Sequence, residues 1–301
     1  METITTSEDA LLAGLIGRGI TLSRTPLMQM REAQAQGMFT VYRKLDMDAP
    51  ERAALTLADM VTGAEAAGFD GLNITYPFKI EVISLLDELS ENARAVGAVN
   101  TVVLKNGKRI GHNTDLWGFA ESFRRGLAGA DTRHAVLLGA GGAGVAVAHA
   151  LADCGVARLS IFDTDPARAE GLAALVAANR PGAETQAVSD LTALFAEDRP
   201  TGVVNATPMG MAKLPGMAID ADLIAGDLWV ADIVYFPLET QLIATARAKG
   251  CRVLPGSGMA VFQAVRAFEL FTGRPADPNR MKATFEAFDK APPAPAAAGN
   301  V

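Results

Sequence analysis

The stretch HAVLLGAGGAGVAVAHALADCG, residues 134–155, carries the clearest indication of fold class in the chain. A short apolar run is followed by Gly139, Gly141 and Gly144 in the pattern G-x-G-x-x-G, and then by an apolar helical pattern. This order is typical of dinucleotide-binding units, because backbone N–H groups at a helix N-terminus bind a pyrophosphate that side chains would hold away. We predict a strand at 134–139, a helix at 141–155 and a dinucleotide site at the turn between them.

The residues after this stretch continue the alternation of strand and helix. We predict strands at 158–163, 184–188, 203–207, 229–234 and 251–256, and helices at 166–179, 190–196 and 238–248. Strands that alternate with helices indicate a largely parallel sheet covered by helices. We therefore expect a Rossmann dinucleotide-binding domain over residues 118–256.

The first half of the chain predicts a second α/β domain over residues 1–117. Strands are expected at 11–17, 39–45 and 71–75, with a hairpin across 99–115 that turns at Asn106-Gly107. We expect helices at 51–67, from Lys79 to about Glu91, and at 116–126. A further helix is expected to have Thr25 as N-cap and Pro26 as its first residue, and to end at Gly37. Helices at 258–273 and 278–289 complete this domain (257–290). The Pro/Ala-rich tail 291–301 predicts disorder.

The strand that follows the glycine turn ends in Asp163, 24 residues after Gly139. A carboxylate at about this distance binds the adenosine ribose and repels a 2′-phosphate, which favours NAD over NADP. Arg168 could bind a phosphate or brace the ribose, and Asp163 could simply cap the next helix. The predicted cofactor contacts in this half are Gly139, Ala140, Gly141, Gly142, Ala143, Asp163 and Arg168.

The composition is that of a soluble globular protein of 301 residues, 50 % hydrophobic and 20 % charged, with a net charge of −7. This balance argues against nucleic acid as a partner, and an anionic substrate would need a local positive group. Two cysteines and three scattered histidines predict neither a disulfide framework nor a metal site. No apolar run is long enough for a membrane span and no basic leader is present, so we expect a cytoplasmic monomer or homodimer.

Short polar segments mark the first half and the last long helix. They are Ser23-Arg24-Thr25-Pro26, N-I-T-Y-P-F-K at 73–79, G-A-V-N-T at 97–101, G-H-N-T-D at 111–115, and Gln263. Further motifs are G-A-G-G at 139–142, N-A-T-P-M-G at 205–210, D-I-V-Y-F-P at 232–237 and, with one inserted residue, G-x-x-M-x-x-Q-A at 256–264. In this order they make the chain similar to the shikimate/quinate dehydrogenase family along nearly its full length.

The resemblance implies two domains with the substrate in a cleft between them, and Lys79 and Asp115 as the catalytic pair. Ser23 and Thr25 would hold the substrate carboxylate, with Tyr235 in reach of the same end. Ring hydroxyls would be bound by Thr75, Lys79, Asn100, Asp115 and Gln263. The nicotinamide side would be lined by Ala206, Thr207, Val234, Gly256, Gly258 and Met259. Oxidation of an alcohol also requires a base for the hydroxyl proton, and no metal is needed.

Two departures from the biosynthetic members refine the expectation. Thr25 replaces a serine, and Asp163-Thr164-Asp165 replaces an Asn-Arg-Thr run that serves NADP. Both resemble the NAD-dependent enzymes that oxidise quinate and shikimate to 3-dehydroquinate and 3-dehydroshikimate. The alternatives are an NADPH-dependent shikimate dehydrogenase, an enzyme for an amino analogue, or a non-catalytic nucleotide-binding protein. Taken one at a time, Lys79 could be a surface group, Asp115 or Thr25 a helix cap, and Gln263 a partner of backbone.

Overall fold

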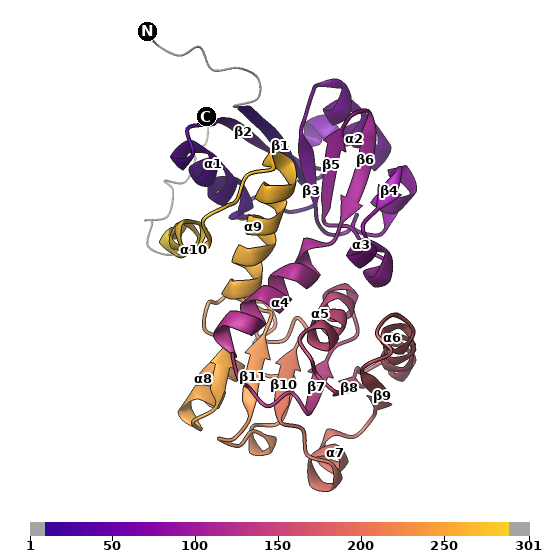
Figure 1. Cartoon of the computed structure of the whole chain (residues 1–301), viewed down its shortest axis with the longest axis vertical. Coiled ribbons are helices and arrows are strands. Elements are labelled where there is room, and N and C mark those ends of the chain that lie inside the picture. Colours follow the sequence, from indigo (N-terminus) through magenta and orange to yellow (C-terminus); the bar gives the residue numbers. More distant parts are fainter. Residues whose placement is uncertain (1–9, 289–301) are drawn as a thin grey trace, which may run out of the picture.

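The computed structural model describes residues 10–288, which form two α/β domains (Figure 1). Helices α4 (Thr114–Gly126) and α9 (Ser257–Thr272) lie between them and pack closely on each other. Their close approach depends on glycine. A Cβ on Gly118 would lie 2.7 Å from the Gln263 nitrogen, and one on Gly258 would lie 2.0 Å from the Ser122 hydroxyl. The presence of two α/β domains confirms the predicted fold class.

The N-terminal sheet is mixed, with the strand order β2-β1-β3-β5-β6-β4. Its strands are β1 (Ala10–Gly17), β2 (Phe39–Asp46), β3 (Gly71–Ile74), β4 (Glu88–Leu89), β5 (Thr101–Lys105) and β6 (Lys108–His112). Strand β5 runs antiparallel to both β3 and β6, and the other neighbours are parallel. The predicted hairpin turns at Asn106 (φ 55°) and Gly107 (φ 70°), the two positive values that a tight hairpin turn needs.

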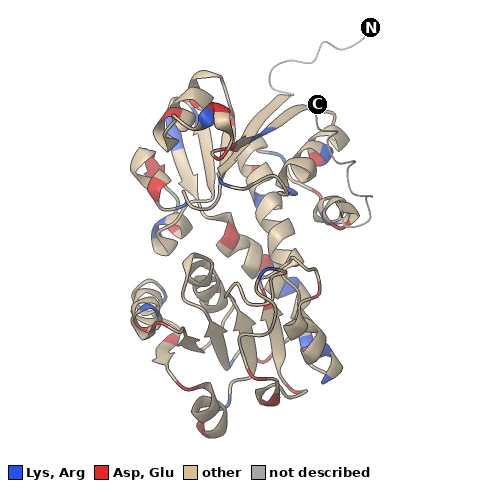
Figure 2. Ribbon diagram, turned by 180° about the vertical axis from the view of Figure 1, so that it is seen from behind, with Lys and Arg blue, Asp and Glu red and all other residues tan. Residues whose placement is uncertain are grey.

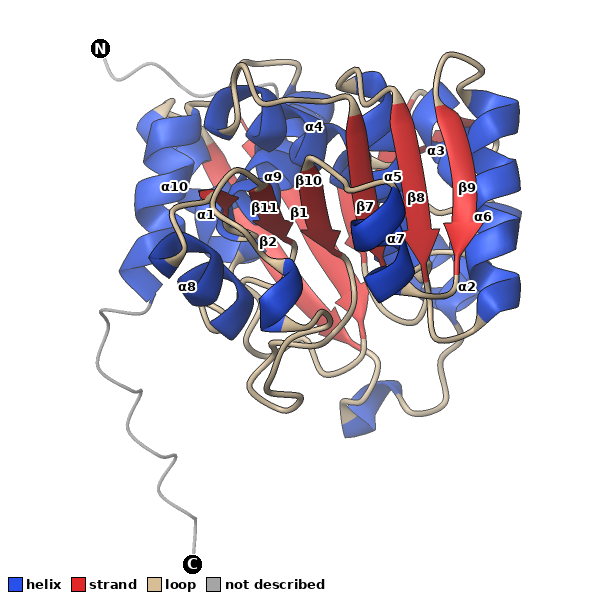
Figure 3. Ribbon diagram, turned by 90° about the horizontal axis from the view of Figure 1, so that it is seen from below, coloured by secondary structure: helices blue, strands red, loops and turns tan. Residues whose placement is uncertain are grey.

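The second sheet is parallel throughout, with the order β12-β11-β10-β7-β8-β9. Its strands are β7 (His134–Leu138), β8 (Arg158–Phe162), β9 (Glu184–Val188), β10 (Gly202–Asn205), β11 (Trp229–Asp232) and β12 (Arg252–Leu254). Helices flank both of its faces (Figure 3), and they include α5 (Gly142–Asp153), α6 (Pro166–Asn179), α7 (Leu191–Glu197) and α8 (Gln241–Ala248). This is the Rossmann-like arrangement that the alternating pattern predicts.

The last two helices return to the N-terminal sheet. Val261, Val265 and Phe268 of α9 share one apolar cluster with Leu11 and Leu15 of β1. This cluster also takes in α1 (Thr25–Ala35) and α10 (Pro278–Ala287). Both C-terminal helices therefore pack against elements of the first half of the chain.

Three predictions of local structure are wrong. Helix α1 has Arg24 at its N-cap, so Thr25 is the first helical residue and caps nothing. The predicted helix 51–67 is a 3₁₀ turn (Pro50–Arg52) followed by α2 (Leu57–Ala66), because Thr56 and Asp59 form a capping box that starts the helix later. The predicted helix between Lys79 and Glu91 is a 3₁₀ helix (Glu81–Leu85), then β4, with α3 (Glu91–Val96) beyond it, since residues 88–89 pair with β6.

The remaining boundaries differ from prediction by a few residues. Helix α4 begins at Thr114 rather than 116, and α8 begins at Gln241 rather than 238, after the Thr240 cap. Within residues 10–288, no helix is long and apolar enough to cross a membrane. The tail predicted to be disordered lies outside the described residues.

Candidate active site

The polar segments of the first half converge on one edge of the mixed sheet. Strands β1, β3 and β6 run in the same direction, so their carboxyl ends share an edge, and antiparallel β5 begins at that edge. The residues that follow or precede these strand ends are Ser23, Thr25, Thr75, Lys79, Asn100 and Asp115. Segments that are far apart in sequence thus reach one place because of strand direction.

Lys79 and Asp115 form an ion pair at this edge. The Lys79 Nζ lies 2.6 Å from Asp115 Oδ2, and the two side chains are 35 % and 15 % exposed. The Lys79 carbonyl accepts a hydrogen bond from the Val99 N–H, which fixes the backbone that carries the amine. Asp115 is the second residue of α4, and the helix is capped by Asn113. Asp115 is therefore not a cap, and both groups reach water and each other.

Three hydroxyls at this edge of the mixed sheet have no hydrogen-bond partner among the described residues. Ser23, Thr25 and Thr75 are each partly buried, and no interaction of their side-chain oxygens with residues 10–288 occurs. Polar groups withdrawn from bulk solvent usually bond either to the protein or to an ordered molecule such as water. Three such hydroxyls at one edge could donate and accept hydrogen bonds with a polar ligand.

Two other predicted contacts are already engaged within the protein. The buried Asn100 side chain accepts the Thr114 N–H at 2.7 Å and donates to the Thr114 hydroxyl at 3.0 Å. One amide hydrogen of Asn100 stays available, since an amide has two. The Gln263 side-chain nitrogen donates to the Ala260 carbonyl at 3.0 Å, which matches the backbone-bonded alternative for this residue. Its amide group also keeps a second hydrogen.

Tyr235 brings the second domain to the same place. It follows β11, the residue is 44 % exposed, and its ring meets the Phe285 ring edge-on with 5.8 Å between the ring centres. Surrounding protein raises the pKa of the Tyr235 phenol, with the Asp115 charge acting in the same direction and the Lys79 and Arg24 charges opposing it. The Arg24 guanidinium, at the start of α1, also lies 4.8 Å from the ring centre of Phe236 in the loop after β11, so the two sheet edges face each other here.

The glycine turn leaves room for a ligand. A Cβ on Gly141 or Gly142 would meet no protein atom within 4 Å, whereas one on Gly144 would lie 2.1 Å from the Gly139 oxygen. Gly144 is thus needed for close contact of helix and strand, and Gly141 and Gly142 border open space. The first turn of α5 has no acidic residue and no side-chain cap, so its N–H groups can meet an anion.

Asp163 lies beside this turn and is held by backbone. Its Oδ2 accepts the Ala140 N–H at 2.7 Å and its Oδ1 accepts the Asp165 N–H at 2.9 Å. Burial opposes ionisation of Asp163, but these bonds outweigh it and lower the pKa of its carboxyl. The helix that follows is capped by Asp165, so Asp163 is not its cap. Arg168 is exposed and pairs with Asp165 at 3.4 Å.

A buried carboxyl group that the sequence prediction missed organises the loops expected to line the nicotinamide. Asp232 accepts hydrogen bonds from the Thr240 hydroxyl, the Val234 N–H and the Asn205 amide at 2.6, 2.9 and 2.9 Å. Asn205 in turn accepts the Thr207 N–H and hydroxyl. Burial raises the pKa of Asp232 to about 6, although the three hydrogen bonds oppose the shift. The motifs at 205–210 and 232–237, which contain Asn205 and Asp232, are the only features named from the sequence that could have indicated this network.

Other residues of the predicted nicotinamide side have structural roles of their own. A Cβ on Gly256 would lie 2.5 Å from the Ile233 oxygen, so close backbone packing explains this glycine without a ligand. Val234 is buried, and Met259 packs against the core of the second domain. The Ala140 N–H is already donated to Asp163. The open backbone at the turn is therefore that of Gly141, Gly142 and Ala143.

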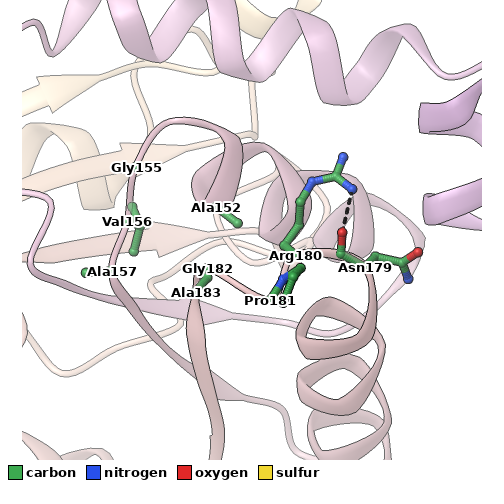
Figure 4. Close-up of a pocket in the computed structure, with 9 residues that line it drawn as sticks. All are labelled: Ala152, Gly155, Val156, Ala157, Asn179, Arg180, Pro181, Gly182 and Ala183. Atoms are coloured by element: carbon green, nitrogen blue, oxygen red, sulfur yellow. Dashed lines mark hydrogen bonds between the residues drawn. The ribbon is translucent and has the colours of Figure 1, made fainter.

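Of two cavities, one lies away from these residues and the other adjoins them at Asn113 and Thr114. One of about 350 Å³ is found where α5 and α6 end, before β8 and β9 begin, and is lined by Asn179, Arg180 and mainly small residues (Figure 4). It is at the amino edge of the parallel sheet, opposite the glycine turn. The other, of about 210 Å³, is lined by residues that include His112, Trp117 and Arg266. Among residues 10–288, no group of three or more His, Cys, Asp or Glu side chains could hold a metal ion.

Comparison with known families matches both ends of the chain. Residues 15–102 match the shikimate dehydrogenase substrate binding domain, and residues 256–284 match the shikimate 5′-dehydrogenase C-terminal domain. The first match contains Ser23, Thr25, Thr75, Lys79 and Asn100. The second contains Gln263.

Comparison with individual proteins covers nearly the whole chain. It is 48 % identical over 285 residues to the quinate/shikimate dehydrogenase (NAD(+)) of Corynebacterium efficiens, covering 93 % of this chain and 99 % of the relative. It is 50 % identical over 280 residues to the shikimate dehydrogenase (NADP(+)) of Streptomyces avermitilis, covering 92 % and 95 %. A solved structure, quinate dehydrogenase from Corynebacterium glutamicum in complex with NAD, superposes with a TM-score of 0.89 at 45 % identity, covering 92 % and 99 %.

Proposed function

The chain belongs to the shikimate/quinate dehydrogenase family, and on that premise we propose that it uses NAD to oxidise a ring hydroxyl of quinate, shikimate or both. Lys79 and Asp115 are the proposed acid–base pair. The observation that carries the proposal is their 2.6 Å ion pair at the edge of the mixed sheet that faces Tyr235. The enzyme class, an NAD(P)-dependent shikimate/quinate dehydrogenase, follows from the family itself.

The chemical step divides between cofactor and protein. The bound dinucleotide supplies the acceptor for the hydride that leaves the ring carbon. In the direction of oxidation, Lys79 first releases a proton to solvent, and its neutral amine then takes the proton of the reacting hydroxyl, while Asp115 orients the amine by accepting one of its hydrogens. In reduction, Lys79 returns a proton to the developing alkoxide. Because both side chains are partly exposed, the proton can exchange with solvent between turnovers.

The remaining residues of the edge bind and orient the substrate. We propose that the Ser23, Thr25 and Tyr235 hydroxyls hold its carboxylate, since none has a partner among the described residues. Thr75, Asn100 and Gln263 bind the other ring hydroxyls, the last two through their second amide hydrogens. A polyhydroxylated acid is thereby fixed at both ends, which restricts the reacting hydroxyl to the neighbourhood of Lys79.

The residues at the glycine turn fit a dinucleotide, and we propose NAD. Open space over Gly141 and Gly142 would admit a pyrophosphate against the N-terminus of α5. Asp163, fixed by two N–H groups and kept ionised by them, would bind the adenosine ribose and repel a 2′-phosphate. Arg168 supports this assignment less, because its partner is Asp165. Relatives of similar identity use either cofactor, so identity alone does not decide between them.

The proposed division of labour follows the two sheets. Residues 1–117, with the helices of 257–290, form the substrate-binding domain, and residues 118–256 form the dinucleotide-binding domain. The substrate then lies between the two facing sheet edges.

One assay with two substrates and two cofactors tests the proposal. Initial rates at the absorbance band of the reduced nicotinamide give kcat/KM for quinate and shikimate with NAD and with NADP. We expect turnover with NAD and a preference for NAD of about tenfold or more, worth about 1.4 kcal/mol. A tenfold preference for NADP would contradict the role of Asp163. Absence of turnover with all four pairs would contradict the proposed activity.

A further inference from the structure

Arg24 lies between Ser23 and Thr25 and, unlike them, is buried, with 5 % of its surface exposed. Burial of a guanidinium is costly unless hydrogen bonds and polarisable groups surround it. One Arg24 nitrogen donates to the Phe285 carbonyl at 2.9 Å, a contact between residues 261 positions apart. A buried charge therefore sits in the middle of the segment proposed to bind the substrate carboxylate.

Three aromatic rings enclose this guanidinium. Its central carbon lies 4.6 Å from the Phe285 ring centre, 4.8 Å from that of Phe236 and 5.4 Å from that of Phe288. Ring faces within about 6 Å attract a cation, and a planar guanidinium stacks on them better than an ammonium does. Phe285 comes from α10, Phe288 directly follows that helix, and Phe236 comes from the loop after β11. One side chain thus joins the start of α1 to both other segments.

The position of this charge matters because the proposed substrates are anions. The protein has a net charge of −7, and basic residues are interspersed with acidic ones over both domains (Figure 2), so attraction must come from nearby groups. The carboxylate end is otherwise built from neutral hydroxyls. The charge of Arg24 is felt at Tyr235, the residue that faces this end from the second domain. Phe285, which Arg24 contacts, also packs against the Tyr235 ring.

We propose that Arg24 is a positioning residue for the substrate carboxylate: its guanidinium, held by three aromatic rings, fixes the Ser23–Thr25 segment and places a cationic group beside the carboxylate end of the site. This inference rests on the proposed function. It predicts that Arg24 acts on substrate binding through its neighbours, and on neither the hydride step nor the dinucleotide.

Two variants of Arg24 separate its charge from its shape. Arg24→Met removes the charge, and Arg24→Lys keeps it but loses the planar group. Phe236→Leu removes the one ring contributed by the second domain and leaves Arg24 intact. Arg125→Lys is the matched control. The Arg125 guanidinium also lies over a ring, that of Phe262 at 4.9 Å, but this residue is in the last turn of α4 and its side chain is exposed. Each protein is assayed for kcat and KM with quinate and shikimate, for NAD affinity by fluorescence titration, and for its thermal midpoint.

We expect the KM of Arg24→Met to rise at least about twentyfold and that of Arg24→Lys about fivefold, with kcat within threefold and NAD affinity unchanged. Phe236→Leu should raise KM about threefold, and Arg125→Lys should leave it unchanged. The inference is overturned if KM in a folded Arg24→Met protein stays within twofold, or if KM and NAD affinity weaken together. Should Arg24→Met fail to fold, an unchanged KM in both Arg24→Lys and Phe236→Leu would overturn it. Lack of turnover by the unaltered protein would instead overturn the proposed function, and the inference with it.

Discussion

The carboxyl edges of the two sheets are built in different ways. At the edge of the mixed sheet, the functional groups are side chains: an amine, a carboxylate and several hydroxyls that follow separate strands lie there. At the edge of the parallel sheet, backbone is presented through glycines, and the polar side chains Asp232, Asn205 and Thr240 bond one another to hold loops. Substitutions at the first edge should therefore change the chemical step, whereas those at the second should change stability or cofactor binding.

The largest effect is expected at the first edge. Lys79→Met should lower kcat about 10³-fold with the fold intact, because general acid–base catalysis contributes about 10²–10⁴-fold. Asp115→Asn should lower kcat less, about 10²-fold, since the amine stays in place. The measurement is steady-state kinetics with NAD and shikimate. A Lys79→Met enzyme with kcat within tenfold of the unaltered protein would remove Lys79 from the mechanism.

The second edge should respond in stability and pH dependence rather than in kcat. The pKa of Asp232 is raised in the folded chain, from an ordinary value near 3.8 to about 6. A raised carboxyl pKa contributes stability that is complete below pH 4 and is lost as pH rises through 6, by about 3 kcal/mol for a shift of this size.

Asp232→Asn cannot titrate, so the unfolding free energy of the unaltered protein minus that of the variant should fall by about 3 kcal/mol between pH 4 and pH 7. Denaturant unfolding at several pH values measures it, and the difference cancels the other titrating groups. A difference that is constant, or that grows with pH, would show that Asp232 is not the buried acid described.

Two glycines of one turn offer a matched pair within the second edge. Gly144→Ala would place a Cβ 2.1 Å from the Gly139 oxygen and should lower stability by about 2–3 kcal/mol. Gly141→Ala meets no protein atom within 4 Å and has an ordinary φ of −76°, so stability should not fall. It should instead weaken dinucleotide affinity about tenfold, since its methyl group enters the space proposed for the pyrophosphate. Thermal unfolding and NAD titration of both proteins separate the two roles, and equal NAD affinity in Gly141→Ala would contradict that placement.

The smallest effect concerns the choice of cofactor. Asp163→Ala removes the carboxylate proposed to repel a 2′-phosphate, so the ratio of kcat/KM with NAD to that with NADP should fall about tenfold. Asp165→Ala serves as control, because it removes a nearby carboxylate that caps α6. If both variants shift the ratio equally, general charge rather than ribose contact sets the preference.

The sequence predicted most of the fold because strand and helix periods alternate clearly, and it named Lys79 and Asp115 through motifs that flank strand ends. Local pattern failed where distant pairing decides, as at Glu88–Leu89, which joins β6. It also failed at Thr25, whose hydroxyl is not used as a cap. Arg24 could not be recognised, because its partners at 236, 285 and 288 are adjacent only after both domains and the last helix have folded. The Asp232 network depends in the same way on neighbouring strands.

A crystal structure of the dead-end complex with NADH and shikimate would show the acid–base pair and the reacting hydroxyl together, since these two ligands cannot react with each other. We predict the Lys79 Nζ and a carboxylate oxygen of Asp115 within about 3 Å of the same ring hydroxyl, with the hydrogen on that carbon facing the nicotinamide held by the second edge. A complex in which these two groups contact different hydroxyls, or in which the ring carbon turns away from the nicotinamide, would contradict the proposed roles of Lys79 and Asp115.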